Sequence, residues 1–305
     1  AVFEKDLDTE ILHDFRVAIR RTRSALAQIK NVFPARTTDR FKKDFADVGK
    51  RSNALRDLDV YLLNQESYKK RLPAVLRDDI DPLFTHLRNK RTKAFQHVLR
   101  GLKSGKYEKI MKDWEAFLNK PPPDSASAAN AELPVIELAR SRIYKKFRGI
   151  VKNGNKILAT TEDELLHALR IECKKLRYLM EFFANLFPRK KINALIAQLK
   201  NLQDNLGDFN DLCVQQEYLL NIATELPDDR QQLQKALVAI GSLVGTLGRE
   251  RQIVKNAFAE TFTDFASQGN KKLFKELFSA QTQPGHAGAK KNQLSRKLES
   301  TKARN

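Results

Sequence analysis

Apolar residues recur at spacings of three and four along most of the chain. This spacing is typical of amphipathic helices, and the apolar/polar alternation expected of strands is absent. Only 12 Gly and 10 Pro interrupt the sequence. The pattern therefore predicts an all-α protein, with helices at about 38–65, 74–104, 107–118, 135–150 and 163–186.

The segment of residues 11–34 occurs a second time, without a gap, as residues 165–188. Seven residues are identical in the two copies: Leu12, His13, Arg16, Arg23, Asn31, Phe33 and Pro34 match Leu166, His167, Arg170, Arg177, Asn185, Phe187 and Pro188. Arg20 and Arg21 match Lys174 and Lys175, so positive charge is retained where identity is not. A repeat of this length indicates two copies of one structural unit.

The repeat and the composition together predict four regions. Residues 1–120 form a first helical repeat, residues 121–134 a linker rich in Pro, Ser and Ala, and residues 135–280 a second helical repeat. Residues 281–305 are basic and contain few large apolar side chains. We expect this last region to be a weakly ordered tail.

Each copy of the repeated helix separates its apolar and cationic residues onto different faces. Seven apolar or small positions form a stripe that we expect to be buried: Ile11, Phe15, Ile19, Thr22, Leu26, Ile29 and Phe33, with Leu165, Leu169, Cys173, Leu176, Met180, Phe183 and Phe187 as counterparts. His13, Arg16, Arg20 and Arg23 fall on another arc of about 80°. Like charges at these spacings destabilise a helix, so their repetition indicates a function.

The whole chain is strongly basic, with 56 Lys and Arg against 37 Asp and Glu. The formal net charge of +19 favours a polyanionic partner, such as nucleic acid, an acidic lipid surface or polyphosphate. No apolar run approaches the roughly 20 residues that span a bilayer. The first residues, AVFEKDLD, carry no signal-peptide pattern. We therefore expect a cytoplasmic protein that does not insert into membranes.

Motifs that would indicate an enzyme are absent from the sequence. There is no GxxxxGK[ST] loop, GxSxG elbow or CxxC pair, so nucleotide hydrolysis, acyl transfer and zinc chemistry lack their usual residues. We expect no catalytic residue, no bound metal and no cofactor.

One metal-binding alternative also repeats. Glu10-x-x-His13 and Glu164-x-x-His167 match half of a di-iron carboxylate site. The basic residues beside each histidine disfavour it, and Glu164 completes a helix-capping box with Thr161.

Four motifs together resemble the CHAD family of α-helical domains. They are HDFRVAIRRTR, LRDLDV, LHALRIECKKLRYLMEFF and LQDNLGDFND, and the resemblance covers most of residues 1–280. It implies two four-helix units, related by a pseudo-twofold axis, around a basic central groove or pore that binds inorganic polyphosphate. Arg56 and Asp57 match the family's Arg-Asp pair, and Asn210 and Asp211 match its second copy. The CYTH triphosphatase domain that often accompanies CHAD is missing, so no enzymatic role follows.

The expected function is therefore non-catalytic binding of polyphosphate, with targeting to polyphosphate granules. Guanidinium groups suit this ligand because they bind phosphate oxygens in a bidentate way. The histidines either donate to phosphate or orient the groove. The expected binding residues are His13, Arg16, Arg20, Arg21, Arg23, Lys42, Arg56, His167, Arg170, Lys174, Lys175, Arg177, Lys200, Arg249 and Arg251. General nucleic-acid binding is the alternative, which the small number of aromatic residues among the cations disfavours, and an enzyme acting on phosphate-rich substrates is a third possibility.

Overall fold

The computed structural model describes residues 9–29, 31–121, 130, 132–160, 162–227 and 230–279. Every regular element in these ranges is a helix, so the all-α prediction is confirmed. The predicted tail, most of the predicted linker and Thr161 of the proposed capping box lie outside the described residues. No helix in the described part combines the length and apolarity needed to cross a bilayer.

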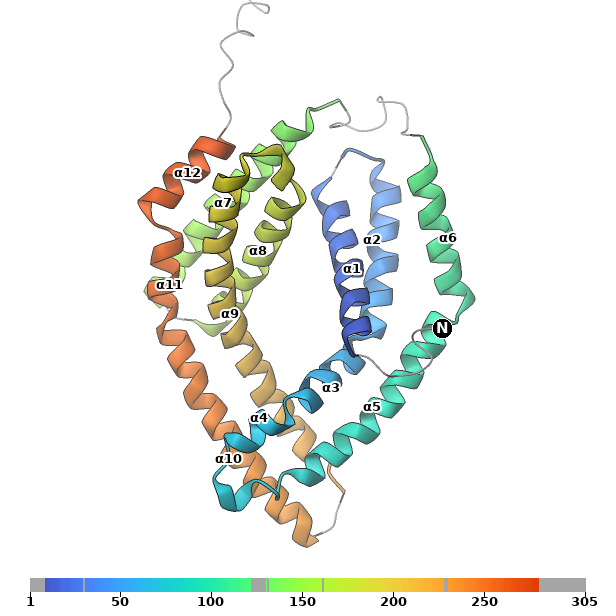
Figure 1. Ribbon diagram of the computed structural model, residues 1–305, viewed down its shortest axis with the longest axis vertical. Helices are drawn as coiled ribbons and strands as arrows, with labels where there is room; N and C mark the ends of the chain where they lie inside the picture. The colour runs from blue at the N-terminus through green and yellow to red at the C-terminus, as the bar shows by residue number, and fades with distance from the viewer. Residues whose placement is uncertain are drawn as a thin grey trace, which may run out of the picture.

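The helices of the first half lie along one side of the molecule in Figure 1, and most of those of the second half lie along the other. The first half contains α1 (Thr9–Gln28), α2 (Ala35–Arg51), α3 (Asn53–Leu63), α4 (Gln65–Lys70), the short turn η2 (Ala74–Leu76), α5 (Asp81–Leu102) and α6 (Gly105–Asn119). The second half contains α7 (Val135–Thr160), α8 (Asp163–Phe182), the short turn η4 (Ala184–Leu186), α9 (Arg189–Ala223), α10 (Arg230–Asn256), α11 (Phe258–Phe265) and α12 (Gln268–Phe278). Helices α3, α5, α9 and α10 from both halves meet at the lower end of the view.

The repeat in the sequence reappears in the helix boundaries. Helices α1 and α8 are both 20 residues long, and they begin at residues 9 and 163. Helix α2 begins at residue 35 and α9 at residue 189, which is the same separation of 154 residues. Along the chain, α5 corresponds to α10, and α6 to α11 and α12. Helix α7 has no counterpart among the described helices of the first half.

The prediction of one long helix at 38–65 is wrong, because the chain there forms the separate helices α2, α3 and α4. The corresponding helix of the second half, α9, continues for 35 residues without a break. The first break falls at Ser52, a side chain only 1% exposed. Its hydroxyl donates to the carbonyl of Gly49 at 2.9 Å. A serine that bonds its own backbone competes with the helical ladder, whereas Leu206 at the matching position of α9 has no such group.

The predicted apolar stripes pack in separate cores: six of the seven positions in the second copy are buried, whereas in the first copy Ile19 and Leu26 are buried and the other five positions are half-buried. In α8, the stripe residues Leu169, Cys173, Leu176 and Met180 are at most 1% exposed and pack with α7, α9, α11 and α12. In α1, Ile19 is buried against α2 and α6. A third cluster joins the two halves through α3, α5, α9 and α10. Tyr61 and Tyr218 stack there with ring centroids 4.3 Å apart.

Helix α7 approaches α11 closely at a glycine. A Cβ added to Gly154 would lie 2.0 Å from Cε2 of Phe262, closer than atoms can approach. Phe262 is 1% exposed and stacks on Phe258, so its ring cannot move aside freely. Gly149 lies in the same helix with no atom within 4 Å of an added Cβ. The two glycines therefore differ in tertiary surroundings but share the same local secondary structure.

We predict that Gly154→Ala lowers the free energy of unfolding by about 1–3 kcal/mol through overpacking. Gly149→Ala, the matched control, should raise it by up to about 1 kcal/mol because alanine favours the helix. Urea unfolding followed by circular dichroism measures both changes. Equal stabilisation by the two substitutions would contradict the close approach of α7 to α11.

Candidate anion-binding site

The two repeated helices, α1 and α8, contact each other, and cations from both lie close to one tyrosine. The guanidinium carbon of Arg20 on α1 lies 5.7 Å from the ring centre of Tyr178 on α8. The guanidinium carbon of Arg177 lies 5.6 Å from the same ring. Both distances are within the range of cation–π attraction. Tyr178 therefore holds one cation from each copy.

Lys174 lies between cations of both copies. Burial lowers the pKa of its ammonium group, and the positive charges of Arg170, Arg20 and Arg177 lower it further, while Asp211 opposes them. Because Arg20 belongs to the first copy, the electrostatic field at Lys174 comes from both copies. We name the six residues Arg16, Arg20, Arg56, Arg170, Lys174 and Arg177 the central basic cluster.

Arg16 fixes α1 to the break between α2 and α3. Its Nη1 donates to the carbonyl of Gly49 at 3.1 Å, to Oγ of Ser52 at 2.7 Å and to Oδ1 of Asn53 at 2.9 Å. Burial lowers the pKa of the Arg16 guanidinium, as do the charges of Arg20 and Arg56, against the opposing effect of Asp57. Arg16 thus satisfies the polar groups that the helix break leaves open.

Arg170, the counterpart of Arg16, belongs to a different arrangement. Its Nη2 donates to Oδ1 of Asp211 at 3.2 Å, and Nδ2 of Asn210 donates to the same oxygen at 3.1 Å. The amide of Asn210 is thereby oriented with Oδ1 toward His167, whose Nδ1 lies 2.6 Å away. Since that oxygen only accepts, Nδ1 of His167 carries the proton. Nε2 of the neutral ring is then an acceptor, unsuited to phosphate.

Several donors of the central basic cluster have no acceptor. Among the described residues, Nη1 of Arg56 and Nε of Arg170 are buried without a hydrogen-bond partner, and Nε of Arg177 makes only an ion-pair contact with Glu181. Burial raises the pKa of the Asp57 carboxyl despite the nearby charges of Arg16 and Arg56. Buried polar groups are nearly always hydrogen-bonded in proteins. The cluster therefore has more positive charge and more donors than its own carboxylates and amides can use.

A hollow next to the cluster runs between the two repeated helices. It is lined by Arg21, Ser24 and Ala25 of α1 and by Tyr178, Glu181 and Phe182 of α8. Glu181 lies 3.4 Å from Nε of Arg177, so its carboxylate offsets part of the positive charge there. Of the predicted residues outside the cluster, Arg21 is the one that lines this hollow.

The other predicted residues have separate surroundings. Lys42 pairs with Asp39 at 2.6 Å within α2, and Lys175 pairs with Glu172 at 2.7 Å within α8. Nη2 of Arg249 donates to Thr246 at 3.0 Å, and Nη1 of Arg251 lies 4.0 Å from Sγ of Cys213. Arg23 and Lys200 are exposed, and His13 is half-buried. Hydrogen bonds and ion pairs of the described residues do not connect these seven side chains to the central basic cluster.

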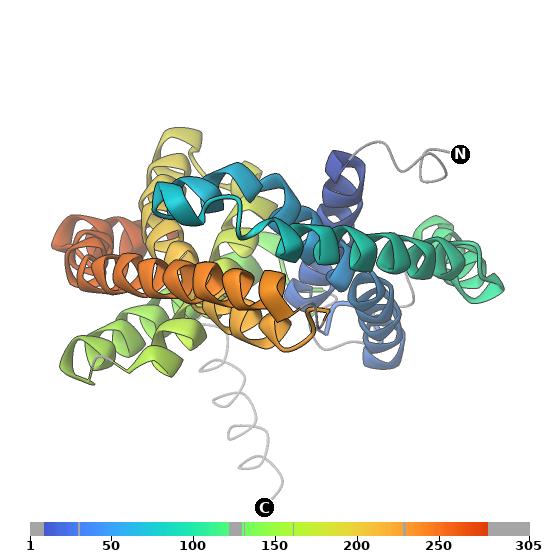
Figure 2. The same cartoon turned by 90° about the horizontal axis from the view of Figure 1, so that it is seen from below.

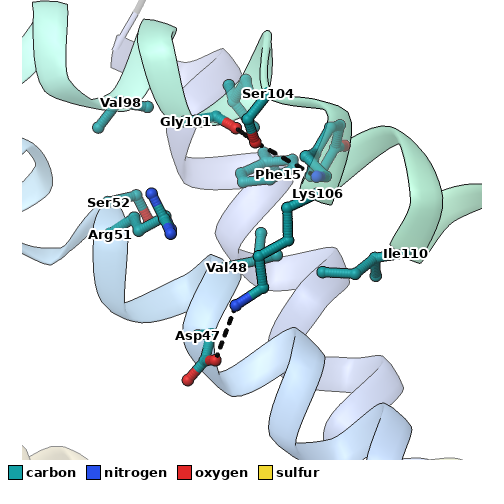
Figure 3. Close-up of a pocket in the computed structure, with 12 residues that line it drawn as sticks. Phe15, Asp47, Val48, Arg51, Ser52, Val98, Gly101, Ser104, Lys106 and Ile110 are labelled. Atoms are coloured by element: carbon teal, nitrogen blue, oxygen red, sulfur yellow. Dashed lines mark hydrogen bonds and ion pairs between the residues drawn. The ribbon is translucent and has the colours of Figure 1, made fainter.

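A small crevice adjoins the break at Ser52 but has a different character (Figure 3). Its walls are formed largely by Phe15, Val48, Val98 and Ile110. Nζ of Lys106 lies 3.6 Å from Oδ2 of Asp47 at its edge. Because most of its wall is apolar, we leave this crevice outside the candidate site.

The geometry of the described residues gives little support to a di-iron site at the two ExxH motifs. Within the part of the chain that the structure describes, no three His, Cys, Asp or Glu side chains group as a metal ion would require. His167 directs Nδ1 to Asn210, and the cations Arg170 and Lys174 lie beside it on α8.

The sequence reasoning missed Tyr178, Ser52 and Asn53 as partners of the predicted cations. Tyr178 ends the motif HALRIECKKLRY, and its position directly after Arg177 was a usable signal. Ser52 and Asn53 gave none, because their role depends on a break that helical periodicity does not reveal.

We predict that Arg16→Ala lowers the free energy of unfolding by about 1–3 kcal/mol, because it removes three hydrogen bonds at the helix break, one of them to the buried hydroxyl of Ser52. Arg170→Ala removes one hydrogen bond to an Asp211 side chain that is 62% exposed, so the loss should be at most about 1 kcal/mol. Urea unfolding of both variants gives the comparison. A loss for Arg170→Ala as large as that for Arg16→Ala would show that the two arginines are used alike.

The fold is shared with two solved structures. The CHAD domain from the plant Ricinus communis is 24% identical, with 85% of this chain and 83% of that chain covered and a TM-score of 0.67. PptA from Streptomyces chartreusis is 15% identical, with 84% and 90% covered and a TM-score of 0.63. No curated protein matches the sequence. A family model described as the CHAD domain matches residues 1–220, well over half of the chain. The protein therefore belongs to the CHAD family.

Proposed function

We propose that the protein binds inorganic polyphosphate, without catalysing a reaction on it, at the central basic cluster and the adjoining surfaces of α1 and α8. One observation carries the proposal: cations from both copies crowd around Lys174 and Tyr178, while buried guanidinium nitrogens of Arg56 and Arg170 have no acceptor among the described residues. A polyanion would supply both the missing acceptors and the missing negative charge. Polyphosphate is also the ligand that the CHAD resemblance implies.

The chemistry of the ligand fits this arrangement. Polyphosphate is a regular row of oxyanions without bases, so it can be bound by a matched row of donors. The positions His13, Arg16, Arg20 and Arg23 extend over ten residues of α1, or about 15 Å of helix rise. In this proposal the two copies form opposing walls of one cationic groove, and two four-helix repeats are related by a pseudo-twofold axis. The equal lengths of α1 and α8, and their separation by the repeat distance of 154 residues, support that relation.

We further propose that binding directs the protein to polyphosphate granules in the cytoplasm. Nucleic acid is the less favoured ligand because Tyr178 lies half-buried between Arg20 and Arg177. Its ring is therefore not available as a stacking platform for bases, which single-stranded nucleic acid requires.

We predict that Arg20→Gln/Lys174→Gln weakens binding of long-chain polyphosphate about tenfold to a hundredfold, because it removes two charge-assisted contacts. Neither side chain fixes a helix break, so the fold should be kept. Calorimetric titration over a range of salt concentrations measures the affinity. The logarithmic salt dependence should become shallower by about 1.4, or about 0.7 for each lost contact with a flexible polyanion.

The matched control is Lys109→Gln/Lys112→Gln on α6. These lysines are exposed and already pair with Asp113 and Glu108, and the double substitution also removes two positive charges. It should leave the affinity almost unchanged. Equal weakening by the two double variants would show that only net charge matters.

Displacement of polyphosphate by RNA at equal charge concentration would favour the nucleic-acid alternative. Release of phosphate on incubation with a divalent metal would contradict the non-catalytic role.

A further inference from the structure

We propose a second binding site for a short phosphate chain, in the hollow between α7 and α12. Five cations line this hollow: Arg148 and Lys152 of α7, and Lys271, Lys272 and Lys275 of α12. We name it the α7–α12 hollow. No acidic residue lines it, and the amides of Asn155 and Gln268 complete its polar lining. Nothing in the duplicated motif includes these residues, so the inference stands independently of the proposed function.

The helical spacing directs these cations toward one ligand. Arg148, Lys152 and Asn155 are separated by four and three residues and therefore share a face of α7. Lys271 and Lys275 do the same on α12, at a separation of four residues. Helix α12 is held on α7 by the ring of Phe274, which stacks on Phe147 with centroids 3.7 Å apart. The buried stack thus fixes two cationic faces on the sides of one hollow.

The five cations have no carboxylate of their own. Among the described residues, none of them forms an ion pair or a side-chain hydrogen bond. The acidic residue nearest in sequence, Glu276, is paired with Lys191 of α9. By contrast, three exposed lysines of α6 each pair with a carboxylate: Lys106 with Asp47, Lys109 with Asp113 and Lys112 with Glu108. The α7–α12 hollow is therefore a local excess of positive charge, whereas the basic surface of α6 is neutralised.

The chemistry favours a small ligand with several phosphoryl groups. The five Lys and Arg side chains outnumber the two amide side chains in the lining, and lysine binds phosphate as a mobile point charge without demanding one geometry. The apolar lining residues Tyr144, Phe147 and Val151 are half-buried or buried, so no large apolar side chain in the hollow is free to enter a bilayer. A concave surface also suits a chain better than a flat membrane.

The hollow lies apart from the central basic cluster. Figures 1 and 2 both place α7 and α12 toward the edge of the molecule that lies away from α1. The described helices of the first half include no counterpart of α7, so the described residues contain this hollow once and the cationic helix twice. Its occupation therefore adds a binding event that the duplicated motif cannot account for.

The test is calorimetric titration of the full chain with tripolyphosphate. The wild type should bind at two kinds of site. Lys271→Gln/Lys272→Gln/Lys275→Gln should remove one of them, and Arg148→Gln/Lys152→Gln, from the opposite helix, should remove the same one. The matched control Lys106→Gln/Lys109→Gln/Lys112→Gln removes equal charge from α6 and should keep both. Circular dichroism confirms that each variant is folded.

The outcomes separate the two proposals. If Arg20→Gln/Lys174→Gln loses binding at the central basic cluster but still binds tripolyphosphate in the α7–α12 hollow, both proposals are supported. If that variant binds like the wild type while the α12 variant loses its site, the hollow holds and the proposed function fails. Equal weakening by the α12 and α6 variants would overturn the hollow as a site. The proposal would also be overturned if the α12 variant keeps tripolyphosphate binding but no longer binds vesicles containing phosphatidylserine, because the surface would then be a membrane contact.

Discussion

The structure depends on the burial of each apolar stripe in the core of its own half, which leaves two cationic faces to meet where α1 contacts α8. In α8, Leu169 and Leu176 are buried with α7 and α9, and in α1, Ile19 is buried with α2 and α6. Burial of a large apolar side chain contributes about 1.5–3 kcal/mol. Repulsion between partly exposed cations is weaker, because solvent and salt screen it. Hydrophobic burial can therefore hold Arg20 and Lys174 close together, although their charges repel.

The two copies have diverged in how they use matching residues. Arg16 supports the break at Ser52, whereas Arg170 belongs to the chain of contacts that joins Asp211, Asn210 and His167. The reason lies in the partner helix, since α9 continues through Leu206 where α2 ends. A duplicated residue keeps its charge, but the groups that it meets depend on the other elements. One copy thus gained a structural anchor and the other an oriented histidine.

The proposed recognition of phosphate rests on cationic groups that have few acceptors or carboxylate partners. The central basic cluster leaves buried donors of Arg56 and Arg170 without acceptors, and burial together with the neighbouring positive charges lowers the pKa of Lys174. The α7–α12 hollow differs, because its cations are mainly lysines without carboxylate partners. Guanidinium groups fixed by neighbours suit an ordered chain of phosphates, and flexible lysines tolerate a variable one. The central basic cluster and the α7–α12 hollow are thus both positively charged, but their cationic side chains differ in flexibility.

The sequence by itself determined the helical class, the buried face of each repeated helix and the cations opposite it. These properties follow from periodicity and local charge, which are encoded within a single helix. Only the tertiary structure decided that Tyr178 lies between Arg20 and Arg177, that Arg16 is occupied at Ser52, and that α7 and α12 enclose a basic hollow. Each of these joins residues on different helices. Their contacts depend on how the helices pack, and a pattern within one helix does not specify that arrangement.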